Sequence, residues 1–246
     1  MLLETENLSK HFGSLKAVND VSLEFNRDQF TAIIGPNGAG KTTFFNMITG
    51  NLAPTDGTIR YKDHDITDDD THEIAERGLA RSFQVTNIFP ALTVRENVRV
   101  GLQKSQEWYN FWRSRSAFSE TAERADEILA MIQLSEHGDK PAQDLSHADQ
   151  RLLEVGLTLS IDPDVVLLDE PTAGMSKDET EHIMDILTEQ ILPQVELVLM
   201  IEHDMDIVME HSERVIVLHN GSVLVEDDPR TVEENDEVQR VYLGES

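Results

Sequence analysis

One glycine-rich segment constrains the fold of this chain more than any other part of its sequence. It follows the continuous apolar run Phe30–Ile34, which suits a buried strand, and it leads into Lys41–Thr49, which suits a helix. It matches the pattern G-x-x-x-x-G-K-[ST], whose glycines let successive backbone N–H groups surround phosphate oxygens. The segment consists of Gly35, Pro36, Asn37, Gly38, Ala39, Gly40, Lys41, Thr42 and Thr43. The sequence therefore predicts a phosphate-binding loop, with Lys41 on the β- and γ-phosphates and the Thr42 hydroxyl on Mg²⁺.

A second apolar run ends in two carboxylates. Val165–Leu168 is followed by Asp169 and Glu170, the Walker B arrangement, in which Asp169 holds Mg²⁺ through water and Glu170 polarises the attacking water. His203 follows the next apolar run, Leu197–Ile201, and can donate to the γ-phosphate or orient the water. Acids that only solvate a loop, and a structural histidine, are the alternative interpretations. The phosphate-binding loop favours the catalytic ones.

Two further residues are candidates for nucleotide contacts. Gln84 follows the predicted short strand Leu79–Phe83, and its side-chain amide can contact Mg²⁺ or water. Phe12 is predicted in a loop after the first strand, where its ring can stack on adenine. The alternatives are an ordinary polar residue for Gln84 and a core phenylalanine for Phe12.

The remaining pattern predicts strands first and then alternating strands and helices. Such alternation is typical of an α/β fold with a largely parallel sheet. Strands are predicted at Leu2–Leu8, Ala17–Phe25, Phe30–Ile34, Leu79–Phe83, Val165–Leu168, Leu197–Ile201, Arg214–Leu218 and Ser222–Val225. Helices are predicted at Lys41–Thr49, Thr93–Gln103 with Thr93 as N-cap and Glu96 three residues on, Ser119–Ile132, Lys177–Gln190 and Met205–His211. Between them, residues 105–118 hold an aromatic and basic cluster that suits either the core of a helical lobe or a docking surface.

Composition excludes several classes of protein. The chain carries 47 Asp and Glu against 20 Lys and Arg, a formal net charge of −27, so its surface should repel nucleic acid and anionic lipid. Dispersed acids of this number are the basis for a hypothesis of a salt-adapted, halophilic host. The longest apolar runs are too short for a bilayer, the N-terminus shows no secretion signal, and cysteine is absent, which together suit the cytosol.

The set and order of these motifs resemble the ATP-binding subunits of ABC transporters over essentially the whole chain. Leu145-Ser146-His147-Ala148-Asp149-Gln150 lies where that family carries its L-S-G-G-Q signature. The resemblance implies that this loop, through Ser146 and Ala148, closes over ATP held by the phosphate loop of a partner subunit. His147, Ala148 and Asp149 depart from the family pattern, and the Cβ of Ala148 stands where backbone must approach phosphate. The departure bears on closure and turnover, and not on ATP binding at Lys41.

The resemblance also implies a fold and an assembly. The fold would be an α/β P-loop NTPase core, residues 1–84 and 163–246, with an N-terminal antiparallel β subdomain and an inserted α-helical signature subdomain, residues 85–162. The partners would be a second ATP-binding subunit in a homo- or heterodimer, two membrane permease subunits and an extracytoplasmic solute-binding protein. The chain would then be peripheral on the cytoplasmic face of the membrane and bind ATP and Mg²⁺.

The segments Ala17–Val21, Asp169–Met175, Ile201–Met205 and Val241–Glu245 resemble importer subunits for branched-chain amino acids, other amino acids or small amides such as urea. Three alternatives remain. A soluble ABC protein of DNA repair or translation is disfavoured because no long coiled coil and no second cassette interrupt the sequence. A GTPase or kinase would lack the combined motif set, and no N-K-x-D motif is present. A regulatory subunit that binds ATP and hydrolyses it weakly is compatible with Ala148.

Overall fold

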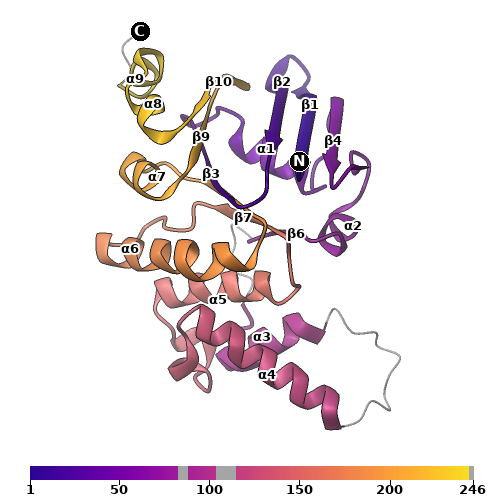
Figure 1. The fold of residues 1–246 in the computed structure, drawn as a ribbon, viewed down its shortest axis with the longest axis vertical. Coiled ribbons are helices and arrows are strands. Elements are labelled where there is room, and N and C mark those ends of the chain that lie inside the picture. The colour runs from indigo at the N-terminus through magenta and orange to yellow at the C-terminus, as the bar shows by residue number, and fades with distance from the viewer. Residues whose placement is uncertain (83–87, 104–114, 244–246) are drawn as a thin grey trace.

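The protein, described here by a computed structural model, consists of two β-sheets and a set of helices (Figure 1). The structure describes residues 1–82, 88–103 and 115–243. Gln84 lies outside the described residues, as does most of the aromatic segment 105–118. None of the helices in the described part is long and apolar enough to cross a bilayer.

The N-terminal residues form an antiparallel sheet, as expected. Its four strands run in the order β2-β1-β4-β5 and are β1 (Leu3–Phe12), β2 (Leu15–Phe25), β4 (Asp56–Tyr61) and β5 (His64–Asp65). The prediction that Phe12 lies in a loop is wrong, because Phe12 is the last residue of β1 and pairs with Leu15. Gly13, at φ 63°, allows the tight reversal that extends both strands of this hairpin.

The second sheet is mostly parallel and carries the predicted site motifs. Its six strands run in the order β10-β9-β3-β8-β7-β6, and every pair is parallel except β10 with β9. The strands are β3 (Gln29–Ile34), β6 (Leu79–Arg81), β7 (Val165–Asp169), β8 (Leu197–Ile201), β9 (Arg214–His219) and β10 (Ser222–Asp227). Parallel strands place their carboxyl ends at one edge, so the residues after β3, β6, β7 and β8 meet there.

The parallel sheet is buried on both faces, which explains its continuous apolar strands. Along β8, Leu197, Leu199 and Ile201 pack toward the antiparallel sheet and helix α1 (Lys41–Ile48), whereas Val198 and Met200 pack toward the helices on the other side. Because side chains alternate along a strand, one apolar run serves two cores.

The helices cover the parallel sheet or gather beside it. In Figure 1, α3, α4 and α5 form the lower part of the molecule, and α3 and α5 pack together. The helices other than α1 are α2 (Thr71–Glu76), α3 (Val94–Gln103), α4 (Arg115–Met131), α5 (His147–Leu159), α6 (Lys177–Asp185), α7 (Met205–His211), α8 (Pro229–Glu233) and α9 (Asp236–Leu243). Short 3₁₀ turns span Ser135–His137, Ala142–Asp144 and Leu192–Gln194.

Two predicted helices differ in detail from the observed ones. The predicted helix Lys177–Gln190 is an α-helix only to Asp185 and continues as a π-helix over Ile186–Ile191. The i to i+5 hydrogen bonds of a π-helix widen the turn here, and Ile186, Leu187 and Ile191 are buried. The helix predicted at Ser119–Ile132 begins four residues earlier, at Arg115.

Candidate functional site

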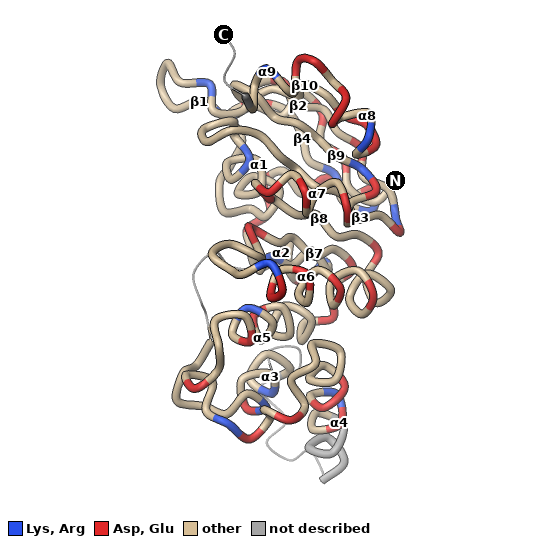
Figure 2. Tube along the Cα trace, turned by 90° about the vertical axis from the view of Figure 1, so that its left-hand side faces the viewer, with Lys and Arg blue, Asp and Glu red and all other residues tan. Residues whose placement is uncertain are grey.

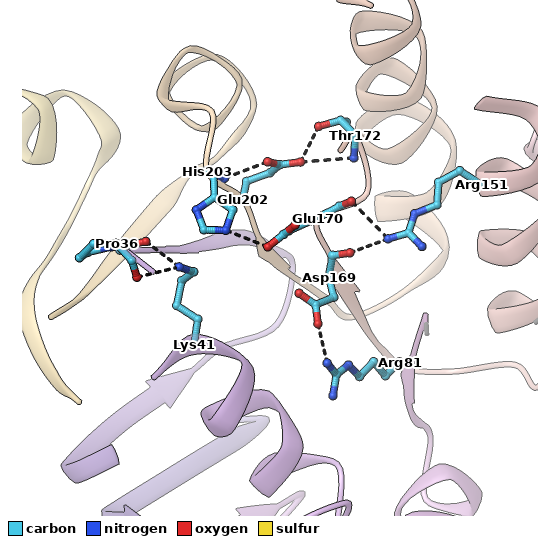
Figure 3. A network of polar contacts seen from close by, with 10 residues as sticks. Pro36, Lys41, Arg81, Arg151, Asp169, Glu170, Thr172, Glu202 and His203 are labelled. Atoms are coloured by element: carbon cyan, nitrogen blue, oxygen red, sulfur yellow. Dashed lines mark hydrogen bonds and ion pairs between the residues drawn. The ribbon is translucent and has the colours of Figure 1, made fainter. Parts of the chain in front are cut away.

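The glycine-rich loop joins β3 to α1, as its pattern predicts. Lys41 begins α1 and is buried, and its Nζ donates to the carbonyl oxygens of Gly35 at 2.6 Å and Pro36 at 3.3 Å (Figure 3). Burial lowers the pKa of Lys41, and the negative charges of Glu170 and Asp169 oppose that effect. The ammonium is therefore held inside the loop, where an incoming anion would restore its preference for the charged form.

A cavity of about 510 Å³ surrounds this loop. Its walls come from the β1–β2 hairpin, the phosphate loop and the residues that follow β7 and β8. Phe12, Gly38, Lys41, Thr42, Glu170 and His203 are among its lining residues. The ring of Phe12 is half exposed there, and Lys10 Nζ lies 5.5 Å from its centre. The chain fold thus brings Phe12, most of the phosphate loop, Glu170 and His203 to one cavity.

Asp169 ends β7 with its side chain fully buried. Its Oδ2 accepts from Arg81 Nη2 at 2.5 Å, and its Oδ1 has no hydrogen-bond partner among the described residues. A buried carboxylate oxygen without a partner is costly unless a cation or water satisfies it. Hard oxygen ligands are those that Mg²⁺ prefers, so the chemistry of the Asp169 carboxylate and of the Thr42 hydroxyl fits such an ion.

Glu170 and His203 form a pair at the mouth of the cavity. Glu170 Oε1 lies 2.8 Å from His203 Nε2 (Figure 3). The position of His203 follows from the strand order. Because β8 lies beside β7 with Asp169 opposite Ile201, the residues that follow the two strands, Glu170 and His203, come close together. The buried carboxylate of Glu202 accepts from the His203 amide at 2.9 Å and from the Thr172 hydroxyl at 2.5 Å. Those bonds fix the loops on which the pair stands.

Three contributors to this site are not apparent from the sequence. Arg81 binds the carboxylate of Asp169 and also donates to Asn46 on α1 at 2.6 Å. Arg151 on α5 donates to the main-chain oxygens of Asp169 and Glu170. Glu202 holds the loops after β7 and β8 together. Arg81 and Glu202 could be suspected from sequence only because each is a charged residue at the end of an apolar strand. No sequence pattern near Arg151 indicates its contact with the segment after β7.

The signature residues Ser146 and Ala148 do not line the cavity around Lys41. Ser146 is the N-cap of α5, and its Oγ accepts from the Asp149 amide at 3.1 Å, while its hydroxyl hydrogen has no acceptor among the described residues. Ala148 is buried in the first turn of the helix. Neither residue lines the cavity, so within one chain the structure does not bring them to the phosphate loop.

Comparisons with known proteins agree with this geometry. The profile of the ABC transporter family matches residues 18–173. The chain is 37% identical over 257 residues to the high-affinity branched-chain amino acid transport ATP-binding protein LivG of Escherichia coli (strain K12), covering 100% of this chain and 98% of LivG.

Two solved structures are similar over nearly the whole chain. One is the ADP conformation of MJ1267, an ATP-binding cassette of an ABC transporter, with a TM-score of 0.88, 32% identity and 99% coverage of both chains. The other is the dimeric post-hydrolysis state of the cassette MJ0796 bound to ADP and Pi, with a TM-score of 0.77, 28% identity and coverage of 93% of this chain and 99% of that one.

Proposed function

This chain belongs to the ABC transporter family, and from that premise we propose that it is the ATP-hydrolysing subunit of an importer for branched-chain amino acids. A related small amide such as urea is the other solute class. The name of LivG supports the solute class, and the observation that carries the hydrolytic role is the Glu170–His203 pair facing the cavity around Lys41.

Nucleotide binding follows from the cavity and its loop. The adenine would stack on Phe12, and the N–H groups of residues 35–43 would surround the phosphates. Lys41 would leave the carbonyl oxygens of Gly35 and Pro36 for the phosphates, where its charge is stabilised.

Mg²⁺ would be held by the Thr42 hydroxyl and by Asp169, whose Oδ1 is available, with Gln84 as a further ligand. When bound, the ion neutralises phosphate charge. Arg81 fixes the Asp169 carboxylate through its other oxygen, so the available oxygen has a defined direction.

Glu170 would orient and polarise the water that attacks the γ-phosphate. His203, bonded to Glu170 through Nε2, holds that carboxylate and can donate to the phosphate after reorientation. Gln84 would contact the same water or the ion.

The working unit would be a dimer with a second ATP-binding subunit. Because Ser146 and Ala148 lie away from the chain's own cavity, they can serve a phosphate only on a partner, and the MJ0796 cassette is dimeric with ADP and Pi bound. Two permease subunits and an extracytoplasmic solute-binding protein would complete the importer, with this chain peripheral on the cytoplasmic side. Nucleic acid is not proposed as a partner, given the charge of −27.

The division of the chain follows from the same premise. Residues 1–84 and 163–246 would be the nucleotide-binding core, and residues 85–162 the signature subdomain. The packing of α3 with α5 supports the grouping of those helices.

A regulatory subunit with weak hydrolysis is a second candidate, since His147, Ala148 and Asp149 replace the glycines and glutamine of the signature. The large acidic excess further supports a salt-adapted host.

The test is steady-state ATPase activity with Mg²⁺ in molar KCl, with dimerisation followed by light scattering. Glu170→Gln should lose on the order of 10²- to 10⁴-fold in turnover, bind ATP and accumulate an ATP-stabilised dimer, because its amide cannot act as a base. Glu210→Gln, an exposed carboxylate on α7, is the matched control and should keep wild-type turnover. An active Glu170→Gln variant would refute the catalytic role, and an inactive wild type that binds ATP would favour the regulatory subunit.

A further inference from the structure

The main chain at Glu170 adopts a conformation that the sequence disfavours. Glu170 has φ 49°, in the left-handed region, although it has a Cβ and precedes Pro171. A residue in such a conformation costs roughly 1–3 kcal/mol and persists when its surroundings hold it. Its amide donates to the Ile201 carbonyl oxygen at 2.9 Å, which fixes one side of the residue.

Arg151 fixes the other side. Its Nη2 donates to the carbonyl oxygen of Asp169 at 2.5 Å and lies 3.3 Å from that of Glu170 (Figure 3). The carbonyl of Leu167 accepts from Ser82 at 2.9 Å, and the carbonyl of Asp169, two residues on, points to the same side of β7. Among the described residues β6 ends at Arg81, so no described residue of that strand bonds the Asp169 carbonyl, and the guanidinium of Arg151 donates to it.

The guanidinium is itself held by a buried ion pair. Arg151 Nη1 lies 2.6 Å from Glu154 Oε2 one turn along α5, and the two side chains are only 12% and 6% exposed. A cavity of about 210 Å³ opens beside Arg151, lined by α5 and the segment after β7. Since space is available on that side, hydrogen bonds rather than close packing set the position of the guanidinium.

We propose that Arg151 is a positioning residue that holds the Glu170 carboxylate in its reactive place and couples the helix capped by Ser146 to it. The inference rests on the proposed function, because it assigns Arg151 a role only if Glu170 acts on water. When α5 moves, Arg151 pulls on the carbonyl oxygens of Asp169 and Glu170. The main chain at Glu170 therefore turns, and the Glu170 carboxylate moves with it. Glu154 orients the guanidinium, so the pair acts together.

The test compares Arg151→Met combined with Glu154→Gln against Glu154→Gln alone. The double change removes both bonds to the carbonyl oxygens without leaving a buried unpaired charge. We expect its kcat to fall on the order of 10- to 100-fold, the scale of a misplaced catalytic group, with KM for ATP and binding of a fluorescent ATP analogue within about twofold. The kcat of Glu154→Gln alone should fall less than that of the double variant. The kcat of Arg151→Lys should lie between that of the double variant and that of the wild type. Arg124→Met, a partly exposed arginine on α4 that pairs with Glu127 and Asp162 away from the site, is the control that keeps activity.

A second readout needs neither turnover nor nucleotide. Amide hydrogen exchange of residues 168–175 should accelerate in the double variant, while β8 keeps its protection, because the loop after β7 loses its hydrogen bonds to Arg151 on α5. Unchanged kcat, or exchange that accelerates throughout the chain, would overturn the inference and assign Arg151 to fold stability alone. If the wild type hydrolyses ATP, Glu170→Gln does not and the double variant does, this inference fails while the proposed function stands.

Discussion

Gly35 and Gly40 stand where the phosphate loop passes closest to neighbouring backbone. A Cβ at Gly40, which has φ 107°, would overlap the carbonyl oxygen of Ala17, and a Cβ at Gly35 would overlap that of Leu218. Both neighbours are main-chain atoms of strands, Ala17 in β2 and Leu218 in β9, so a shift of either would disturb a sheet. These two positions need glycine for space as well as for conformation.

Gly40→Ala should therefore destabilise the chain far more than Gly13→Ala. Both positions have positive φ, which costs about 1 kcal/mol for alanine, but a Cβ at Gly13 meets no atom of the described residues within 4 Å. Gly40→Ala adds the clash with Ala17, and we expect a total loss of roughly 3 kcal/mol or more and loss of ATP binding. Urea unfolding in molar KCl measures the stability of both variants. Equal losses of stability would show that a small shift of the hairpin relieves the clash.

Helix ends explain part of the acidic content at the scale of elements. Asp70 and Glu73 form a capping box on α2, Ser176 and Glu179 form one on α6, and Asp228 caps α8. The side-chain hydroxyl of Ser176, and then its backbone amide, hold the pKa of Glu179 below its usual range. Acids in these places satisfy N–H groups that the helix leaves unpaired and favour the positive end of its dipole.

The α6 box predicts a pH dependence of stability. Because the folded pKa of Glu179 is depressed, its contribution is fully present above the unfolded value of about 4.3 and is lost as pH falls through the folded pKa. Ser176→Ala removes the hydroxyl bond to the Glu179 carboxylate and also the N-cap bond that the hydroxyl oxygen accepts from the Glu179 amide. Its melting temperature should therefore lie below that of the wild type at every pH, and by more at pH 6 than below about pH 4, because only the bond to the carboxylate depends on pH. Ser14→Ala, in the exposed hairpin turn, is the control and should follow the wild type at every pH. A constant difference between pH 3 and 7 would contradict the role of Glu179.

Charge dominates at the scale of the whole molecule. Figure 2 shows acidic residues over the upper and lower parts of the chain rather than in one patch. A net charge of −27 repels itself in the compact state, and screening shortens the reach of that repulsion from about 10 Å at 0.1 M salt to about 3 Å at 1 M.

Salt should accordingly stabilise the protein. Between 0.1 and 2 M KCl we expect the melting temperature to rise by about 10 °C or more, the equivalent of several kcal/mol for a chain of this size. Sucrose, which is excluded from protein surfaces but screens no charge, is the control and should give a smaller rise. A melting temperature that is high in dilute buffer and unchanged by KCl would contradict the salt-adapted host.

Much of the parallel sheet could be predicted from sequence because its strands are continuous apolar runs. The strand β8 has the predicted bounds, and Gly35–Thr43 follows β3 and opens α1 as its pattern requires. Strands β4 and β5 and helix α2 are not among the predicted elements, although Asp70 with Glu73 marks a helix start. That signal is short, and the two strands before it are too short to stand out.

The sequence by itself determined the local chemistry: a phosphate loop, a strand ending in Asp169 and Glu170, and a histidine one strand later. Such patterns are readable because the loop geometry depends on neighbouring residues and because parallel strands end at one edge of the sheet. Only the tertiary structure decided which cations bind these two residues: Arg81 binds the Asp169 carboxylate, and Arg151 binds the main-chain oxygens of Asp169 and Glu170. Arg81 is 88 residues from Asp169, and Arg151 is 18 residues from it on a different element. Contacts of that kind depend on how α5 and β6 pack beside β7, and no periodicity or spacing in the chain records that packing.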